Sequence, residues 1–507
     1  MFPVPSSPNA KASSPLKQHN TRIASAALWI VLLCIPLIPC FYHLGEMPLR
    51  VWDESRQAHN AYEMYQSHHY GVPTYEGKVD TFGTKPLLFI WAEVLCMHAM
   101  GVNEFALRFP AALLAYLLIV LVMAQVWKHT KWYGLAVIAG ILLSCSTALI
   151  RLHVARTADY DAPLALFLGL ACFSFYNYIS TLRIRYIYLT FTGMALAVLV
   201  KGIAGLVFVP LLVLWALLHH NRMVILRSLH TWLALLFFLT LTLGTYLIRE
   251  MYQPGYMAFV YWAEWQTIYF KTVQGHEEPF AFYLQNFYSK FFASYYWLLS
   301  LSAVSMIFIK DRNVKQWLLF AAVCSVYYML IISLSATKLP WYDAPVYAPV
   351  AVLCCGIFYL LGEQLMLRKV SVQKINLIFL IAALLLFLPE MKRMKHELID
   401  GEETPGEKAF YTMASYLQHT CRTQGNLSGY KILSGNAYSP HHTFYIRQLQ
   451  ERGQRVEHAV FDSLQFGDSV LVFEQNMKEL VTNKFETTVL DSNNAIFAFR
   501  LEALKQP

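Results

Sequence analysis

Long apolar runs alternate with short polar segments over most of the chain. Each of twelve such runs is 16 to 20 residues long, close to the length of about 20 apolar residues that a helix needs to cross a bilayer. The pattern therefore predicts a mainly α, polytopic membrane bundle. The runs cover residues 23–42, 86–102, 109–127, 132–150, 162–180, 185–200, 203–219, 230–248, 292–309, 317–336, 344–362 and 374–390.

The run at 86–102 decides on which side of the membrane every later segment lies. It contains Glu93 and His98, which suit an interfacial helix better than a helix that faces lipid. If this run does not cross, fifteen Lys and Arg fall on the cytoplasmic side and four in the short outer loops; if it crosses, the bias reverses. Because Lys and Arg in short loops favour the cytoplasm, we expect about eleven spans, in a range of 11 to 13, and an interfacial helix at 86–102.

This topology divides the chain into three parts. Residues 1–22, rich in Ser and Pro, are expected to form a disordered cytoplasmic tail, and residues 23–392 the membrane domain. Residues 401–507 have the composition of a soluble domain. Their periodicity predicts a small α/β domain with helices near 405–420, 441–453 and 476–484, strands near 430–434 and 469–473, and two terminal strands separated by 491–494.

Composition agrees with a bilayer as the main solvent. Hydrophobic residues make up 57% of the chain and charged residues 14%, and the mean hydropathy is +0.40. The net charge of +8 is spread over short clusters between apolar runs rather than over one basic domain, so we do not expect nucleic acid as a partner. The nine cysteines lie mostly inside apolar runs, with no spacing typical of a metal site or a disulfide framework.

The first outer loop, residues 43–85, is the main candidate for a catalytic site. Asp53 and Glu54 are adjacent, and their repulsion can raise the pKa of one of them into the range that a general base needs. Arg56 follows at helical spacing, where it can pair with Asp53 or bind a phosphate. Lys85 closes the loop at headgroup depth and can hold a lipid phosphate. Each residue also has a structural alternative: Asp53 can cap the helix, Arg56 can form a surface ion pair, and Lys85 can be an ordinary snorkelling lysine.

A second acidic segment lies at 156–161, before an apolar run. Asp159 and Asp161 accompany Arg156 there, and the three residues can cap the helix, orient the arginine of the first loop or bind a cation. Further along, Lys201 interrupts an otherwise continuous apolar stretch, which indicates either a functional charge or a tight turn between helices.

Two later outer loops add candidates. The loop at 249–291 contains His276 and Glu277 in an aromatic context; these two could bind a metal, although a structural histidine explains the pattern as well. The loop at 337–343 contains Lys338 and Tyr342, which supply positive charge and a hydroxyl donor against a phosphate, or belong to the interfacial belt.

Taken in order, these motifs resemble a known family. They are similar to the GT-C fold glycosyltransferases that use polyprenyl-phosphate sugars, and among them to the lipid A aminoarabinose transferases, which are related to protein O-mannosyltransferases. The carriers of the likeness are Asp53-Glu54 with Arg56, Lys85-Pro86, the segment 156–161, Leu199-Val-Lys201-Gly202, and Lys338-Leu-Pro-Trp-Tyr342 leading to Pro345 and Pro349.

The resemblance implies roles for these residues. Asp53 is expected to act as catalytic base or to orient the acceptor, with Glu54 beside it, and Arg56, Lys85 and Tyr342 to bind the carrier phosphate. The list is completed by Asp159 as a supporting carboxylate and by Lys201 and Lys338 as further substrate-binding positions. One departure is Thr84, where the aminoarabinose branch has a glutamate that contributes, with a loop histidine, to a metal site.

The expected function is transfer of a sugar, with inversion, from a polyprenyl-phosphate carrier to a lipid (lipid A-like), protein or glycan acceptor. We expect the enzyme in the bacterial inner membrane, with the catalytic loop and the C-terminal domain periplasmic. No cofactor is required by the pattern, although a divalent metal is compatible with it. The alternative is a transporter or flippase of lipid-linked sugars, which would bind the same partners without chemistry and would be expected to show internal repeats; the sequence shows none.

Overall fold

The computed structural model describes residues 33–505 except 271–274, 276, 292–294, 401–403, 435–437 and 494–495. The predicted tail at 1–22 and the first half of the first predicted span, residues 23–32, therefore lie outside the described residues. The same holds for His276, one of the two residues considered for a metal site in the long loop.

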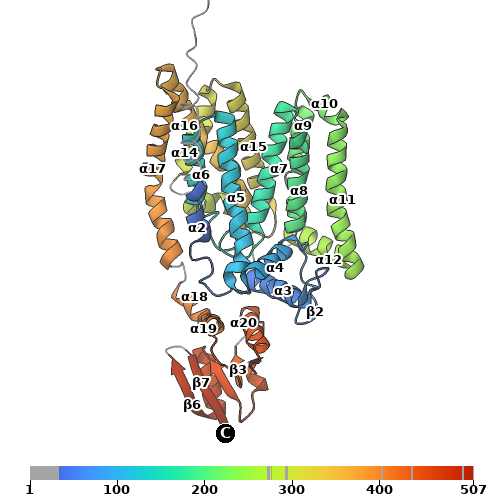
Figure 1. The fold of residues 1–507 in the computed structure, drawn as a ribbon, viewed down its shortest axis with the longest axis vertical. Coiled ribbons are helices and arrows are strands. Elements are labelled where there is room, and N and C mark those ends of the chain that lie inside the picture. The colour runs from blue at the N-terminus through green and yellow to red at the C-terminus, as the bar shows by residue number, and fades with distance from the viewer. Residues whose placement is uncertain are drawn as a thin grey trace, which may run out of the picture.

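Long apolar helices run side by side along the length of the molecule (Figure 1). Among the described residues, six helices are long and apolar enough to cross a membrane, and the bent helix α17 (Val372–Asp400) adds a seventh. The bend of 44° in α17 follows Leu385, four residues before Pro389, and a proline inside a helix removes the hydrogen bond to the carbonyl at that position. The six are α5 (Glu104–Thr130), α7 (Asp161–Thr181), α8 (Ile184–Lys201) with the 3-10 turn η1 (Gly202–Leu206), α11 (Leu229–Tyr252), α15 (Arg312–Leu334), and η4 (Pro340–Val346) with α16 (Tyr347–Leu367).

Four apolar runs form shorter helices. Helix α4 (Leu88–Met100) has 13 residues, a rise of about 20 Å that is less than the thickness of the hydrocarbon core, about 30 Å. It lies beside α3 (Asp53–Ser67) at one end of the bundle (Figure 1), where an interfacial helix would lie. The other three are α6 (Tyr133–Ser144), α9 (Val209–Leu218) and α14 (Tyr296–Phe308). The predicted fold class, a polytopic helical bundle with a small C-terminal α/β region, is confirmed.

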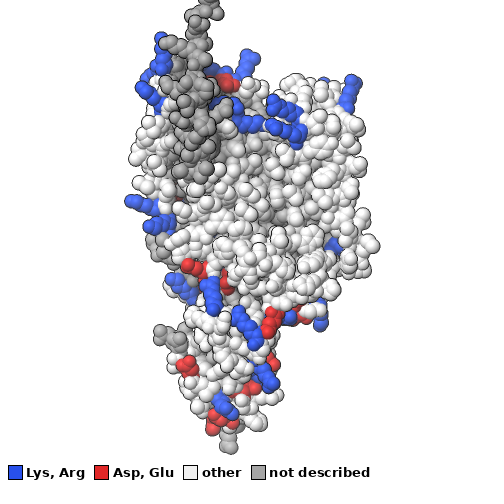
Figure 2. Space-filling view, in the orientation of Figure 1, with Lys and Arg blue, Asp and Glu red and all other residues white. Residues whose placement is uncertain are grey.

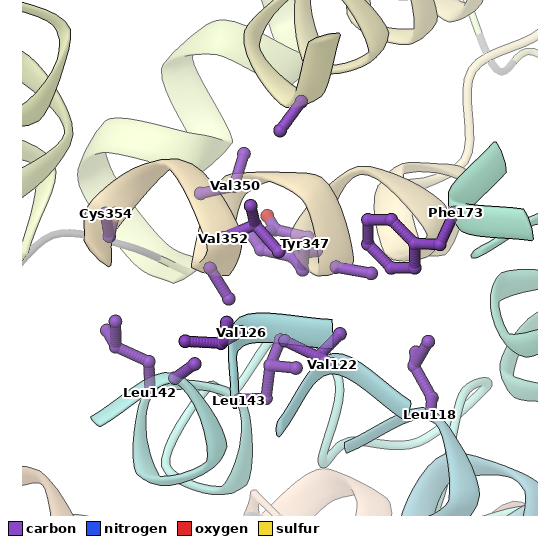
Figure 3. Close-up of a cluster of buried hydrophobic side chains, with 14 of the residues drawn as sticks. Leu118, Val122, Val126, Leu142, Leu143, Phe173, Tyr347, Val350, Val352 and Cys354 are labelled. Atoms are coloured by element: carbon purple, nitrogen blue, oxygen red, sulfur yellow. The ribbon is translucent and has the colours of Figure 1, made fainter. Parts of the chain in front are cut away.

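The core of the bundle lies between α16 and the pair α5 and α6 (Figure 3). Small residues allow close helix contact elsewhere: a Cβ at Gly193 in α8 would lie 2.9 Å from the Phe167 carbonyl oxygen in α7. Such close approach is typical of helices packed within a membrane. The labelled core residues are Leu118, Val122, Val126, Leu142, Leu143, Phe173, Tyr347, Val350, Val352 and Cys354.

We call the end of the bundle that carries α3 and α4 the site end. The loops that gather there contain a small hairpin and several short helices rather than long regular elements. These are β1 (Thr74–Tyr75), β2 (Lys78–Val79), α12 (Tyr256–Val260), the π-helical turn η2 (Tyr261–Phe270), α13 (Phe282–Asn286) and η3 (Phe287–Phe291). Two further short helices are α2 (Leu37–Phe41) and α10 (Arg222–Arg227), of which α10 lies at the opposite end (Figure 1).

The C-terminal region is a five-stranded sheet with helices, placed beyond the site end (Figure 1). Its strand order is β4-β3-β5-β7-β6, with parallel pairing around β3 and antiparallel pairing on both sides of β7. The sequence did not predict β4, which has only three residues. The elements are α18 (Pro405–Phe410), α19 (Thr412–Arg422), β3 (Tyr430–Leu433), α20 (Pro440–Glu451), β4 (Glu457–Ala459), η5 (Phe461–Ser463), β5 (Ser469–Val472), α21 (Gln475–Lys484), β6 (Phe485–Asn493) and β7 (Ile496–Leu504).

This C-terminal region holds the segment that leads into α3. The Tyr445 hydroxyl donates to Glu104 Oε1 at 2.8 Å and accepts the Leu49 N–H at 3.0 Å. The Tyr411 hydroxyl accepts the Val51 N–H at 3.3 Å. Apolar residues of α3, α19 and α20 share one buried cluster. The sheet region therefore fixes the position at which α3 begins.

Charged residues are distributed unevenly over the surface. Figure 2 shows a broad belt around the bundle that is largely free of Lys, Arg, Asp and Glu. Above it, at the end away from the C-terminal region, Lys and Arg predominate, whereas both signs occur around the site end and the C-terminal region. The belt has the character of a surface in contact with lipid, so the chain is a membrane protein.

Candidate active site

Two acidic segments that are about a hundred residues apart in sequence meet at the site end. Asp53 is the first residue of α3, and Asp159 lies in the loop before α7. Together with His153 they form a group whose ligand atoms all lie within 4.8 Å of one another. The site therefore brings two carboxylates and an imidazole together.

The backbone before Asp53 is strained. Trp52, directly before α3, has φ of 75°, a left-handed conformation that is uncommon for a bulky residue. Such conformations persist only where the surrounding structure enforces them, and they cluster at functional sites. Here the enforcing contacts include the Val51 N–H held by Tyr411 and the Arg50 N–H held by Glu54.

Glu54 is a scaffolding residue, which corrects the prediction that it is catalytic. Its Oε1 accepts Arg108 Nε at 2.7 Å and the Ala158 N–H at 3.0 Å, and its Oε2 accepts Arg108 Nη2 at 2.9 Å and the Arg50 N–H at 2.8 Å. These four bonds use the acceptor capacity of the carboxylate. Burial alone would raise the pKa of Glu54, but Arg108 and the two backbone donors lower it. Glu54 therefore joins α3, α5 and the acidic loop.

Asp53, in contrast, is accessible. Its side chain reaches solvent but is crowded by neighbouring protein, and this crowding together with the charge of Asp159 raises its pKa. The positive charges of His153, Lys201 and Lys85 oppose that shift. Asp53 thus lies within electrostatic reach of Lys85 and Lys201, two of the three lysines that the sequence proposed as substrate ligands.

His153 is the residue of the site that sequence reasoning missed. Its Nδ1 lies 3.0 Å from Asp159 Oδ2, and its ring stacks on Trp341 at 3.9 Å between centroids. Burial would lower the pKa of His153, but Asp159, with Asp53 and Asp161, raises it. The available signal was its position six residues before Asp159, in the same short loop.

Both predicted lysines are paired with buried carboxylates. Lys201 Nζ lies 2.5 Å from Asp161 Oδ2 and 4.9 Å from the centre of the Tyr342 ring. Lys85 Nζ lies 2.8 Å from Glu264 Oε1. Each lysine is therefore held at the site end by an acidic group from another part of the chain. The structure brings Tyr342 into this group, as the sequence suggested.

Arg56 has a different partner from the one predicted. Its guanidinium binds Asp80 through Nε at 3.0 Å and Nη2 at 2.7 Å, and it lies over the rings of Tyr75 and Phe82 at 4.6 and 4.7 Å. Of the two alternatives that the spacing left open, pairing with Asp53 is not observed. The fork of Arg56 is bound by this carboxylate and holds the first loop, and its role toward a carrier phosphate stays a prediction.

Two other predicted positions lie apart from this group. Lys338 is buried and its Nζ donates to the Ser335 carbonyl at 2.7 Å. Glu277 is exposed and forms an isolated bridge with Thr337. Its proposed partner His276 lies outside the described residues, so the pair in the long loop gains no support as a metal site.

The residues that could hold a metal are instead Asp53, His153 and Asp159. Two carboxylates and one imidazole are a donor set that suits Zn²⁺ or Mn²⁺, at ligand distances of about 2.0–2.2 Å. The spread of up to 4.8 Å between their ligand atoms is close to what one ion would bridge. An ion would replace the hydrogen bond between His153 and Asp159, and the two carboxylates would offset its charge. The three residues therefore fit a divalent cation.

Comparison with known proteins points to one class of enzyme. Residues 84–246 match the family model described as dolichyl-phosphate-mannose-protein mannosyltransferase. An uncharacterized protein of Aquifex aeolicus is 27% identical over 382 residues, which are 70% of this chain and 68% of that protein. The undecaprenyl phosphate-alpha-4-amino-4-deoxy-L-arabinose arabinosyl transferase of Aeromonas salmonicida is 25% identical over 66% of this chain, and the match spans only 59% of that enzyme.

Solved structures show the same architecture. The crystal structure of ArnT from Cupriavidus metallidurans bound to undecaprenyl phosphate has a TM-score of 0.67 at 16% identity, over 94% of this chain and 98% of that one. The Archaeoglobus fulgidus oligosaccharyltransferase in the apo form has a TM-score of 0.54 at 12% identity, over 93% of this chain and 74% of that one. These likenesses confirm the resemblance that the motifs indicated, and they show a shared fold.

Proposed function

We propose that this protein, which has the GT-C fold and is related to the aminoarabinose transferases, is a membrane glycosyltransferase that moves a sugar from a polyprenyl-phosphate carrier to an acceptor. The observation that carries the proposal is the convergence at the site end of an accessible carboxylate, Asp53, with Lys85 and Lys201, both of which act on its charge. An anionic leaving group needs positive charge to stabilise it, and an acceptor needs a carboxylate to take its proton or orient it. This site has groups for both.

The chemistry follows from these groups. The acceptor oxygen attacks the anomeric carbon, and the bond from that carbon to the carrier phosphate breaks with inversion. The phosphate leaves with the electron pair, and Lys85 and Lys201, with Tyr342 beside them, stabilise the charge that develops on it. Where the acceptor is a hydroxyl, Asp53 takes its proton; where the acceptor is an ionised phosphate, Asp53 only orients it.

A divalent cation suits the same place. Asp53, His153 and Asp159 would hold it, and when bound it supplies positive charge that polarises an acceptor or phosphoryl oxygen. Trp341 fixes the ring of His153 by stacking, and the Tyr160 N–H, which donates to Asp159 Oδ1 at 2.7 Å, orients the second carboxylate. These supporting contacts would keep the three ligands in register.

We place the site end on the outer face of a bacterial inner membrane. The predominance of Lys and Arg at the opposite end (Figure 2) supports this orientation, because positive charge marks the cytoplasmic side. The relatives from Aquifex and Aeromonas support a bacterial setting. Residues 401–507 would then be periplasmic and serve as a support for the first loop, with acceptors drawn from lipids, proteins or glycans of the envelope.

The experiment compares cells that have the protein, lack it, or carry it as Lys85→Ala. Mass spectrometry of envelope lipids and proteins should find a glycosylated species that disappears in the second and third strains, while the sugar-bearing carrier accumulates. Equal membrane levels of the Lys85→Ala protein, measured by immunoblot, exclude loss of folding as the cause. An envelope that is the same in all three strains would contradict the proposal, and the species that disappears would identify donor and acceptor.

A further inference from the structure

Lys85, the proposed ligand of the carrier phosphate, is neutralised by an internal carboxylate in this structure. Glu264 in η2 binds it at 2.8 Å, although the two residues are 179 positions apart in the sequence. The Glu264 side chain is 2% exposed and that of Lys85 is 22% exposed. A phosphate that approaches from the accessible side of Lys85 therefore meets an ammonium group that already has an anionic partner.

The second oxygen of the Glu264 carboxylate, Oε2, is held by the backbone of residues 202–203. It accepts the Ile203 N–H at 3.3 Å. A Cβ at Gly202 would lie 2.4 Å from the same oxygen, and Gly202 has φ of 59°, so only glycine leaves room for the carboxylate there. The glycine of the Lys201-Gly202 motif thus serves the approach of Glu264 to the site.

A second buried cation lies next to this pair. Arg249 is 4% exposed, and its Nη1 has no hydrogen-bond partner among the described residues. Its other nitrogens share the neutral Gln253 Oε1, at 3.1 and 3.0 Å. The guanidinium lies 4.9 Å from the centre of the Tyr256 ring, and the Tyr256 hydroxyl donates to the Thr84 carbonyl at 2.7 Å, beside Lys85.

The carboxylate within electrostatic reach of Arg249 is Asp80, which Arg56 already binds. Tyr256 lies within electrostatic reach of both Arg249 and Glu264 and connects the two. An unpaired, buried guanidinium nitrogen is costly, and a phosphate oxygen is a partner that would satisfy it. A phosphate bound at Lys85 would therefore also find a hydrogen-bond donor in Arg249 Nη1.

We propose that Glu264 is an internal competitor of the carrier phosphate: it occupies Lys85 when the site is empty, and Lys85 exchanges it for the phosphate, assisted by Arg249, when the donor binds. This proposal rests on the proposed function. The competition also acts after transfer, because the free carrier phosphate carries more negative charge than the sugar-linked diester and would otherwise leave slowly. Glu264 retakes Lys85 and so favours release of the carrier.

The test uses the full-length protein in detergent and a polyprenyl phosphate as the probe, with binding followed by tryptophan fluorescence. Glu264→Gln keeps an oxygen for the Ile203 N–H and removes the charge. We expect this variant to bind the probe about tenfold more tightly, as about 1.4 kcal/mol of relieved competition implies. In the Lys85→Met background the same substitution should change the affinity little, because the contested cation is absent.

Two results would overturn the inference: Glu264→Gln binds the probe as the native protein does or more weakly, or it binds more tightly to the same degree without Lys85. An ion pair with a purely structural role predicts the weaker binding. Glu264→Asp, which keeps the charge, serves as the matched control, and monodisperse elution of every variant shows that it is folded. If the native protein binds the phosphate no better than the uncharged polyprenol, the proposed function itself fails.

Discussion

The sharpest prediction concerns Asp53 and Glu54, two adjacent carboxylates to which we assign different roles, one in activity and one in stability. Asp53→Asn should leave the fold intact, because Asp53 reaches solvent and is near the like charge of Asp159. It should remove activity, because Asp53 is the proposed base or orienting carboxylate. Loss of a positioned base or orienting charge costs about 10²- to 10⁴-fold in turnover, or about 2.7–5.4 kcal/mol of transition-state stabilisation. The free energy of unfolding should change by no more than about 0.5 kcal/mol.

Glu54→Gln should show the reverse. It removes the carboxylate that binds the fully buried Arg108 guanidinium, which then keeps only the more weakly acting Glu104 as a counter-charge. The NH₂ group of Gln is also a donor, and it would face the N–H donors that Glu54 accepts. Breaking a buried pair in this way costs about 3–5 kcal/mol, so the protein should unfold at a clearly lower temperature. The molecules that remain folded should retain much of their turnover.

The assay measures both quantities on each variant. Thermal unfolding in detergent gives stability, and release of labelled sugar from a polyprenyl-phosphate donor, divided by the folded fraction from size-exclusion chromatography, gives turnover per folded molecule. An Asp53→Asn protein with native turnover would refute the role of Asp53. A Glu54→Gln protein that is as stable as the native one but inactive would refute the division of roles.

Three further predictions concern neighbouring groups. Lys201→Met should raise the KM for the donor and lower the unfolding temperature, because it leaves Asp161 buried without its partner; kinetics and thermal unfolding test this. His153→Ala should weaken binding of Mn²⁺ by about 10- to 100-fold in calorimetry, and unchanged binding would contradict the cation site. Burial would raise the pKa of Glu63, but hydrogen bonds from His59, Thr74 and the Gly77 N–H lower it to about 2. The stability that Glu63 contributes is therefore present above about pH 4.3 and is lost as pH falls toward 2, so the loss caused by Glu63→Gln should shrink over that range.

The sequence predicted the membrane bundle because span length and apolar composition are local properties. The run 109–127 lies within α5, and the run 317–336 follows α15 to its end at Leu334. A charge within an apolar chain is costly enough to mark a site wherever it falls. The same reasoning singled out Asp53, Lys85 and Lys201, and in the structure both lysines lie within electrostatic reach of Asp53.

The ion-pair partner of each charged residue, in contrast, could not be predicted from the sequence. Arg108 lies 54 residues from Glu54 and Glu264 lies 179 residues from Lys85, and no local pattern encodes such distances. Helical spacing allowed Arg56 to pair with Asp53 or to bind a phosphate, but it binds Asp80 in the returning hairpin loop. A sequence thus indicates which residues have to be paired in an apolar protein, while the fold decides which pairs form and which carboxylate stays available.

The most direct test of the account is the fate of the bond between sugar and carrier in the purified protein. With a polyprenyl-phosphate-linked sugar and an envelope extract as acceptor, in detergent where transport has no meaning, we predict free polyprenyl phosphate and a glycosylated acceptor in equal amounts, and neither with Asp53→Asn. If the donor stays intact there, while the same protein in liposomes moves it from one leaflet to the other, the protein is a transporter and the account is wrong.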